Sequence, residues 1–516
     1  MKKKTVTGYF AAITLILATA ALQLYFNKDF YFAMNRAKCS FTMIVLIGAL
    51  ITAISRPIER IWKKQEKQRM TLLDWCVLIF GCSSLITCIL SEAPELTLVG
   101  TKGMFVGAFT YFTGMLLYFV VSRNMIPNLG VTCVLIAAWT VIFIWTIVNQ
   151  CGVDIHGMHQ NIKPSDVMLY VSSMGNNNSA SDAFATIVPF IIFICLYTKK
   201  HLGYYVLLVI CFLGLLASYV LGNDGVFLGF LTITPFIAAS LLTDIRKVKN
   251  MIVLMLIIGL SLSFFHFLNN CSILISPEGI IEKITNYWIG ELLVVCSIII
   301  HLMYNHGSFK ISQQTLRTLR VVIIVSCAAV LIGFVTISIL KSSNDPKYGS
   351  YRGALWKGCV WSFRLYNPKE MIFGLGSGMF SKNVTLAISM LIGREPDYTY
   401  ATCHNSLLQA LLGNGIIGLL CLLIGLYALI RDWFRDLRPI VLRPMSKYES
   451  IRNVEFNEVI RVASFTAIMG YFGASLVEST YPHTVMLLFA MLALYRSSYF
   501  VPRKKKEKKS IESQSI

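Results

Sequence analysis

The sequence predicts an all-α, polytopic integral membrane protein with about 14 transmembrane helices (a range of about 12 to 14) and a long extracytoplasmic loop before the twelfth span. Of the 516 residues, 56% are hydrophobic and 14% are charged, about half the roughly 25% charged content of soluble domains. Apolar runs recur along the whole chain, and Lys and Arg gather in alternate connecting segments. A soluble protein is therefore excluded.

Fourteen stretches approach the length of about 20 apolar residues that crosses a hydrocarbon core about 30 Å thick. The shortest is 183–197, and Gly222, Asn223, Asp224 and Gly225 supply a turn between two closely joined spans. We read them as 8–26, 37–55, 72–90, 104–121, 129–149, 183–197, 202–221, 225–242, 251–268, 286–303, 321–340, 405–430, 462–478 and 484–500.

The net charge of +20 fits a bilayer better than nucleic acid, and we expect no nucleic-acid partner. With a cytoplasmic amino terminus, 32 of the 46 Lys and Arg fall in inner segments, so the positive-inside rule places both termini in the cytoplasm. The tail 501–516 carries six bases between Arg503 and Lys509. They either anchor the topology or bind anionic membrane lipids.

The spans divide the chain into helices 1–11 (1–340), an extracytoplasmic loop (341–404), helices 12–14 (405–500) and the basic tail (501–516). No Cys-x-x-Cys pair occurs among the 14 cysteines, and most lie in apolar spans, so a disulfide framework is not expected. A single bridge among Cys151, Cys271, Cys359 and Cys403, near the outer surface, stays open.

The segment 341–404 is too apolar and aromatic for a disordered loop, so it should fold against the membrane. Its run 353–366 predicts a helix lying at the interface, because one helical face carries Leu355, Trp356, Cys359, Val360 and Phe363. A loop with glycines at 374, 376 and 378 follows. It either lets backbone amides approach an anion or acts as a flexible connector.

The last part of this segment carries polar groups at the start of an apolar helix. His404 stands at the outer rim, and Asn405 and Gln409 are one helical turn apart. Polar groups at membrane depth are expensive enough to indicate a function, although a histidine wetted by the interface is an equal alternative for His404.

Four features follow one another along the chain: Gly175-Asn176-Asn177-Asn178-Ser179-Ala180, Arg352 before Trp356, the glycines 374, 376 and 378 with Phe380, and His404-Asn405 with Gln409 and Gly415. Their order resembles the O-antigen ligase and polymerase family of multi-spanning glycosyltransferases, which move glycans from undecaprenyl diphosphate carriers. The resemblance covers about 175–420, and its histidine-asparagine motif is the most specific part.

This resemblance implies an inverting, metal-independent transfer without a cofactor, in which Arg352 binds the diphosphate and His404 orients or deprotonates the acceptor hydroxyl. A guanidinium holds diphosphate charge through paired hydrogen bonds, and an imidazole suits general-base work. Ligases of the family carry another arginine near the turn where this chain has Asp224. Either Lys357 or Arg364 supplies the second cation, or Asp224 has a different role such as acceptor recognition.

The expected substrate-binding residues are therefore Asn405, Gln409, Asp224, Lys357, Arg364 and Gly376. Other polar groups are weaker candidates. Asp154, His156 and His159 fit either a zinc site or a solvated loop. The segment Glu478–His483 fits either a turn with satisfied polar groups or a substrate contact.

The resemblance implies an enzyme of the bacterial cytoplasmic membrane that polymerises or ligates lipid-linked repeats of O-antigen, capsule or exopolysaccharide. Its partners would be an undecaprenyl diphosphate-linked glycan donor and a glycan or lipid acceptor. A polysaccharide flippase or other secondary transporter is the alternative, since about 14 helices with both ends inside is a common count for that class. A non-catalytic envelope scaffold is a third possibility.

Overall fold

The computed structural model describes residues 5–63, 69–160, 162–198, 202–243, 245–275, 279–306, 312–345, 349, 351–392, 400–437 and 456–498. The regular structure of the described residues is helical apart from one two-stranded antiparallel sheet, in which Tyr170 pairs with Asn176 and Val171 with Gly175. The expected basic tail 501–516 lies outside the described residues.

The first half of the chain holds the elements α1 (Val6–Ile16), η1 (Leu17–Ala21), α2 (Leu22–Leu24), η2 (Phe30–Ala33), α3 (Met34–Lys63), α4 (Leu72–Leu90), α5 (Pro94–Val99), α6 (Ala108–Asn124), α7 (Leu129–Gln150), η3 (Pro164–Leu169), β1 (Tyr170–Val171), η4 (Ser172–Met174), β2 (Gly175–Asn176), α8 (Asn177–Tyr197), α9 (Leu202–Val220) and α10 (Asp224–Leu241). Here η1 is a π-helix, and η2, η3 and η4 are 3₁₀-helices.

The second half holds α11 (Ile245–Asn270), α12 (Ile280–Thr285), α13 (Ile289–Asn305), α14 (Gln313–Asn344), α15 (Arg352–Arg364), α16 (Pro368–Phe373), α17 (Phe380–Ile392), α18 (Ser406–Asp432), the π-helix η5 (Trp433–Leu437), α20 (Phe456–Ala474) and α21 (Pro482–Ser497). Each of the fourteen apolar stretches expected from the sequence overlaps a helix, but the bounds differ. The stretch 8–26 covers α1, η1 and α2, the stretches 104–121, 286–303 and 462–478 extend past a helix end, and 484–500 extends beyond the described residues. Among the described helices, ten are long and apolar enough to cross a membrane, and α13 is a shorter apolar helix. The all-helical fold class is confirmed, and these helices are compatible with a multi-pass membrane protein.

Local sequence signals account for several helix starts. Thr71 and Asp74 form a reciprocal capping box at the start of α4, and the Asn128 side chain caps α7. The helix predicted over 353–366 appears as α15, which buries Leu355 and Cys359. All fourteen cysteines carry free thiols, so no bridge forms in this structure.

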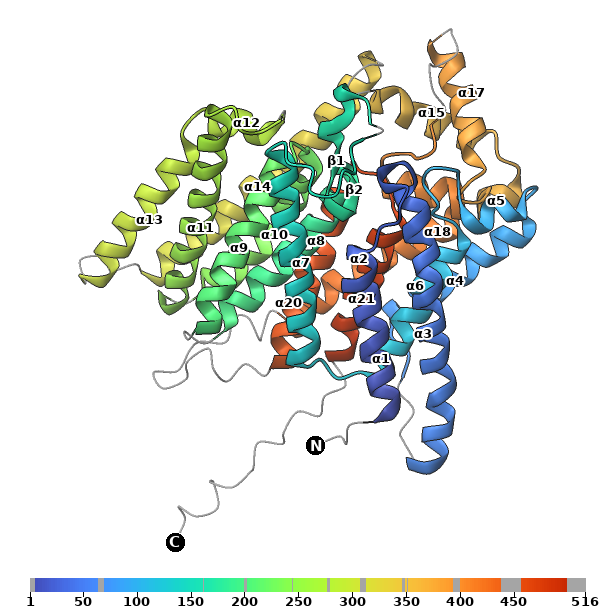
Figure 1. Ribbon diagram of the computed structural model, residues 1–516, viewed down its shortest axis with the longest axis horizontal. Coiled ribbons are helices and arrows are strands. Elements are labelled where there is room, and N and C mark those ends of the chain that lie inside the picture. The colour runs from blue at the N-terminus through green and yellow to red at the C-terminus, as the bar shows by residue number, and fades with distance from the viewer. Residues whose placement is uncertain are drawn as a thin grey trace.

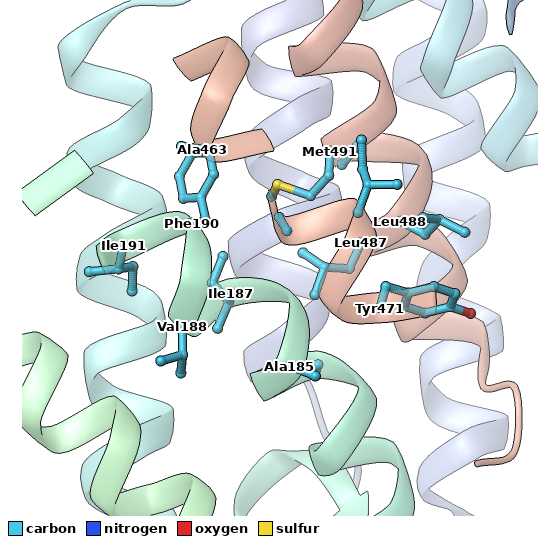
Figure 2. Packing of buried hydrophobic residues seen from close by; sticks show 14 of the residues in the cluster. Ala185, Ile187, Val188, Phe190, Ile191, Ala463, Tyr471, Leu487, Leu488 and Met491 are labelled. Carbon is cyan, nitrogen blue, oxygen red and sulfur yellow. The ribbon is translucent and has the colours of Figure 1, made fainter. Parts of the chain in front are cut away.

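The centre of the bundle is built from α8, α20 and α21. Residues 179–196 of α8 are all buried, and α20 packs closely against this helix. Figure 2 shows Ile187 and Phe190 of α8 among side chains of α20 and α21, including Leu487 and Met491. At the periphery, α13 and α14 expose many large apolar side chains, as expected for helices that face lipid.

The two ends of the bundle differ. In Figure 1, α5, α12, α15, α17 and the small sheet lie at the upper end, and α1 begins at the lower end. At the start of α4, Asp74 accepts hydrogen bonds from Tyr118 and Arg496 and pairs with Arg123 at 2.8 Å. This buried cluster ties α4, α6 and α21 together. The helices α15 and α17, which belong to the segment 341–404 that we expect to carry the chemistry, lie at the upper end in Figure 1.

Candidate functional site

His404 is held in a strained loop immediately before α18. Its φ of 46° lies in the left-handed region, which residues other than glycine rarely adopt without support from their surroundings. The next residue, Asn405, caps α18 by accepting hydrogen bonds from the backbone amides of Leu407 and Leu408. The Asn405 amide also donates to the Leu476 carbonyl at 2.9 Å. Asn405 therefore fixes the loop against the α20–α21 connection.

The residues on either side of His404 are fixed as well. The Gln409 side chain is buried and accepts a hydrogen bond from the Cys403 backbone amide at 3.1 Å. Trp356 of α15 donates from its indole nitrogen to the Cys403 carbonyl at 3.2 Å. The contacts of Asn405 and Gln409 therefore position the loop, and α15 packs directly against it.

The His404 ring faces the α20–α21 connection. Its Nδ1 lies 3.1 Å from the Ser479 hydroxyl oxygen. Burial and, secondarily, the nearby Arg352 charge lower the pKa of His404 to about 3. The imidazole is therefore neutral at physiological pH and has a nitrogen lone pair available to accept a proton.

Arg352 reaches the same connection from the first turn of α15. Its guanidinium lies 3.7 Å from the Glu478 carboxylate, longer than a close ion pair. The Arg352 side chain is 26% exposed, whereas the Glu478 side chain is 1% exposed. Arg352 thus offers a cation at the surface of the site, with a buried acid behind it.

Glu478 sits in an enclosed niche formed by the α9–α10 turn. Its side chain packs closely on Gly225 in the first turn of α10, and a Cβ added at that position would have to displace the Glu478 side chain. Burial raises the pKa of Glu478 to about 8, although Arg352 and the Asn223 amide favour the charged form. Glu478 is therefore mostly protonated at neutral pH.

The turn that holds Glu478 also contacts the start of α8. Asn223 donates from its side-chain amide to the side-chain oxygen of Asn178 at 2.8 Å. Asp224 is exposed, and its carboxylate accepts the Ile280 backbone amide at 2.8 Å. The glycine-asparagine segment, the α9–α10 turn, Arg352 and His404 are consequently brought into one region.

Further along α15, Lys357 and Arg364 lie about 8 Å and 18 Å from Arg352 along the helix axis, rotated roughly 140° and 120° from it. They do not share the helix face of Arg352, and Arg364 is exposed.

The glycine-rich loop contacts a break in α18. The helix leaves helical geometry at Gly415, and the backbone amides of Leu375 and Gly376 donate to the carbonyls of Leu412 and Gly413. Gly376 has a φ of +100°, and an added Cβ would collide with Thr97. The Gly376 amide is therefore engaged by the protein backbone, and this loop joins α5, α16 and α18.

Two acidic groups of this region are not among the expected site residues. The sequence pattern favours a turn for Glu478, and it places Asp182 just outside a span. The Asp182 carboxylate is fully buried in α8, has no hydrogen-bond partner among the described residues, and interacts electrostatically with Glu478. The available signal is an acid at the end of an apolar stretch: Glu478 is the last residue of 462–478, and Asp182 directly precedes 183–197.

The Asp154–His159 loop is ordered by its own contacts. Asp154 accepts the backbone amides of Met158 and His159, and the His159 ring contacts the Tyr170 carbonyl. Within the described ranges, no group of three His, Cys, Asp or Glu side chains is placed to hold a metal.

Comparisons with known proteins give no assignment: no family model matches the chain, and no curated protein matches it significantly.

Proposed function

We propose that this chain is a glycosyltransferase of the bacterial cytoplasmic membrane that polymerises or ligates undecaprenyl diphosphate-linked oligosaccharide repeats at the outer face. The observation that supports the proposal best is the convergence of Arg352 and His404 on one short connection, at Glu478 and Ser479 respectively. The resemblance in sequence gives these two residues complementary roles, and the geometry is compatible with both.

In the proposed reaction, the acceptor hydroxyl oxygen attacks the anomeric carbon of the donor glycan. The bond from that carbon to the diphosphate oxygen breaks, and undecaprenyl diphosphate leaves with the bonding electron pair. Arg352 binds the diphosphate and stabilises the charge that develops on the leaving oxygen. The acceptor proton passes to the His404 imidazole.

The low pKa of His404 makes it a weak base in the absence of donor, because burial and the charge of Arg352 disfavour imidazolium. A bound diphosphate compensates the charge of Arg352 and raises the pKa of His404. The imidazole thus becomes a better proton acceptor when the donor is in place. The contact with Ser479 restricts how the ring is oriented during the transfer.

The proposal is tested with purified protein in lipid vesicles, using a lipid-linked oligosaccharide as donor and acceptor. We expect Arg352→Ala and His404→Ala each to lower the transfer rate by roughly 10²-fold or more. Arg317→Ala and His301→Ala are matched controls, because both side chains are exposed on α14 and α13. Wild-type rates in both site variants, with normal protein levels, would refute the proposal.

A secondary transporter is the second candidate, and two observations favour it. The helix α18 is broken at Gly415, and α8 buries Asp182 without a hydrogen-bond partner among the described residues. Broken helices and intramembrane acids are typical of transport sites. A flux assay of a fluorescent lipid-linked glycan across vesicles separates the candidates. Flux that is lost in Asp182→Asn and kept in His404→Ala favours transport.

A further inference from the structure

Two buried cysteine thiols meet beside the candidate site. Cys359 lies in the middle of α15, and Cys403 directly precedes His404. Their thiol groups interact through a side-chain hydrogen bond, and both side chains are fully buried. Of the four cysteines that the sequence places near the outer surface, the fold therefore brings these two together.

Other contacts hold the two segments in register around the thiols. Trp356, one helical turn before Cys359, donates from its indole nitrogen to the Cys403 carbonyl at 3.2 Å. The Gln409 side chain accepts the Cys403 backbone amide at 3.1 Å. Both cysteines also belong to one apolar cluster, which contains Tyr366. The approach of the two thiols is therefore fixed by the backbone and by neighbouring side chains on both segments.

A second pair of cysteines makes the same contact in a different environment. Cys195 of α8 and Cys211 of α9 are buried and interact through a side-chain hydrogen bond. The helix α8 begins beside the small sheet at the upper end in Figure 1, and Cys195 lies near its other end. Both residues are inside candidate membrane spans, whereas Cys359 and Cys403 lie outside the candidate spans of the described chain. An oxidant in water therefore has access to the second location and not to the first.

We propose that Cys359 and Cys403 form a disulfide bond that joins α15 to the loop carrying His404. The oxidant is a disulfide of the extracytoplasmic space. One cysteine thiolate attacks that disulfide and releases one of its sulfurs as a thiol, and the second cysteine then displaces the other sulfur. The two cysteine sulfurs are oxidised, the oxidant is reduced to two thiols, and the two cysteine protons end on those thiols. The inference rests on the outer-face location given in the proposed function and not on the transfer reaction.

The burial of the pair determines when the bond forms. Burial and, secondarily, the hydrogen bond with Cys359 raise the pKa of the Cys403 thiol, so the attacking thiolate is scarce once the cluster has closed. The exchange therefore takes place before α15 packs against the loop. After packing, the same burial keeps soluble reductants away from the bond.

The bond would constrain both residues proposed for chemistry. Arg352 lies seven residues before Cys359 on α15, and His404 follows Cys403 directly. The left-handed φ of His404 persists only where its surroundings hold it, and a covalent link one residue away adds such a constraint. The link also joins residues 44 positions apart, which removes conformational freedom from the unfolded chain.

The first experiment uses the wild-type full chain, expressed in a bacterial membrane. Cells are quenched with acid, and the denatured protein is alkylated with N-ethylmaleimide before any reduction. Peptide mass spectrometry should find a linked peptide that contains Cys359 and Cys403 in most molecules. The other twelve of the fourteen cysteines, including Cys195 and Cys211, should carry the alkyl group.

Thermal unfolding separates a bond from simple packing. Cys359→Ala and Cys403→Ala break the same bond, so each should lower the unfolding temperature by roughly 4 °C, and the double variant should lower it little further. Alanine is chosen because a serine hydroxyl would be buried in an apolar cluster. In the matched pair, Cys195→Ala and Cys211→Ala remove only packing, so their smaller effects should add.

Three results would overturn the inference: alkylation of both Cys359 and Cys403 in most molecules, a bridge found as often between Cys195 and Cys211, which indicates oxidation during handling, or additive losses in Cys359→Ala and Cys403→Ala. The transfer assay reports on the proposed function separately. A bridge together with active Arg352→Ala refutes the enzyme but keeps the disulfide, whereas free thiols together with inactive Arg352→Ala refute the disulfide alone.

Discussion

Glu478 provides a sharp test of the site because its charge opposes the binding of a diphosphate. Burial raises its pKa from 4.5 to about 8, so the carboxyl is protonated at pH 7 and ionises above pH 8. An ionised carboxylate 3.7 Å from Arg352 attracts the guanidinium by about 4 kcal/mol at an effective dielectric constant of about 20. An incoming anion must compete with that attraction.

The expected size follows from the titration. If only the protonated form binds the diphosphate well, wild-type affinity falls by about tenfold between pH 7 and pH 9, because the protonated fraction falls by that factor. Glu478→Gln mimics the protonated carboxyl at every pH, so its affinity should match wild type at pH 7 and exceed it by about tenfold at pH 9. Undecaprenyl diphosphate binding by thermophoresis in detergent measures both.

The control is Glu95→Gln, which makes the same chemical change at an exposed acid of α5. It should keep the wild-type pH dependence. Titration of the diphosphate itself affects all three proteins and cancels in the comparison. A wild-type affinity that stays flat from pH 7 to pH 9, or an identical decline in Glu478→Gln, would refute the role given to Glu478.

The same shift predicts stability without any ligand. Because the folded pKa of Glu478 lies above its ordinary value, the stabilisation from its protonated form is fully present below pH 4.5 and is lost as the pH rises through about 8. The thermal unfolding temperature of wild type should therefore fall between pH 7 and pH 9, and Glu478→Gln should reduce that fall. Equal declines in both proteins would contradict the burial of this acid.

Three further changes test other contacts. Arg352→Lys should keep the charge but lose paired hydrogen bonds to the diphosphate, so transfer should fall less than in Arg352→Ala but by more than about tenfold; full activity would rule out bidentate binding. Gly376→Ala should destabilise the protein by about 1–3 kcal/mol in thermal unfolding, because the added Cβ collides with Thr97. Gly103→Ala, at a similar φ of +95° but with no atom within 4 Å of the added Cβ, should destabilise it less. Equal losses of stability would show that the backbone angle alone matters. Asp74→Asn should lower the free energy of unfolding by about 3–5 kcal/mol, because Arg123 and Arg496 lose their buried anion. An unchanged unfolding temperature would show that these charges are solvated and not buried.

The helices were predictable because their main signal is local. A run of apolar residues long enough to cross a hydrocarbon core is visible in the sequence, and every expected stretch overlaps a helix. The helix α15 was predictable for the same reason, from the spacing of Leu355 and Cys359, although Val360, expected on that face, is 47% exposed. Length and composition alone do not determine how many of these helices cross the membrane.

The glycine-rich loop shows the limit of local reasoning. The sequence leaves open whether this segment approaches an anion or is a flexible connector, and in the fold Gly374 and Gly376 both have positive φ. The need for glycine arises from close packing on Thr97 and on the break in α18, contacts between segments far apart in the chain. A glycine pattern predicts an unusual backbone, but the neighbour that requires it becomes visible only in the fold.

The position of Glu478 follows the same logic. An acid between two apolar helices is costly wherever it lies, and the sequence contains no measure of what it faces. Folding places it against Arg352, 126 residues earlier in the chain, and against Gly225, whose missing side chain makes the niche. Its raised pKa is thus a property of three distant segments together. The candidate site is therefore best tested through these couplings, because a site assembled by folding changes its proton affinity when any one of the three is altered.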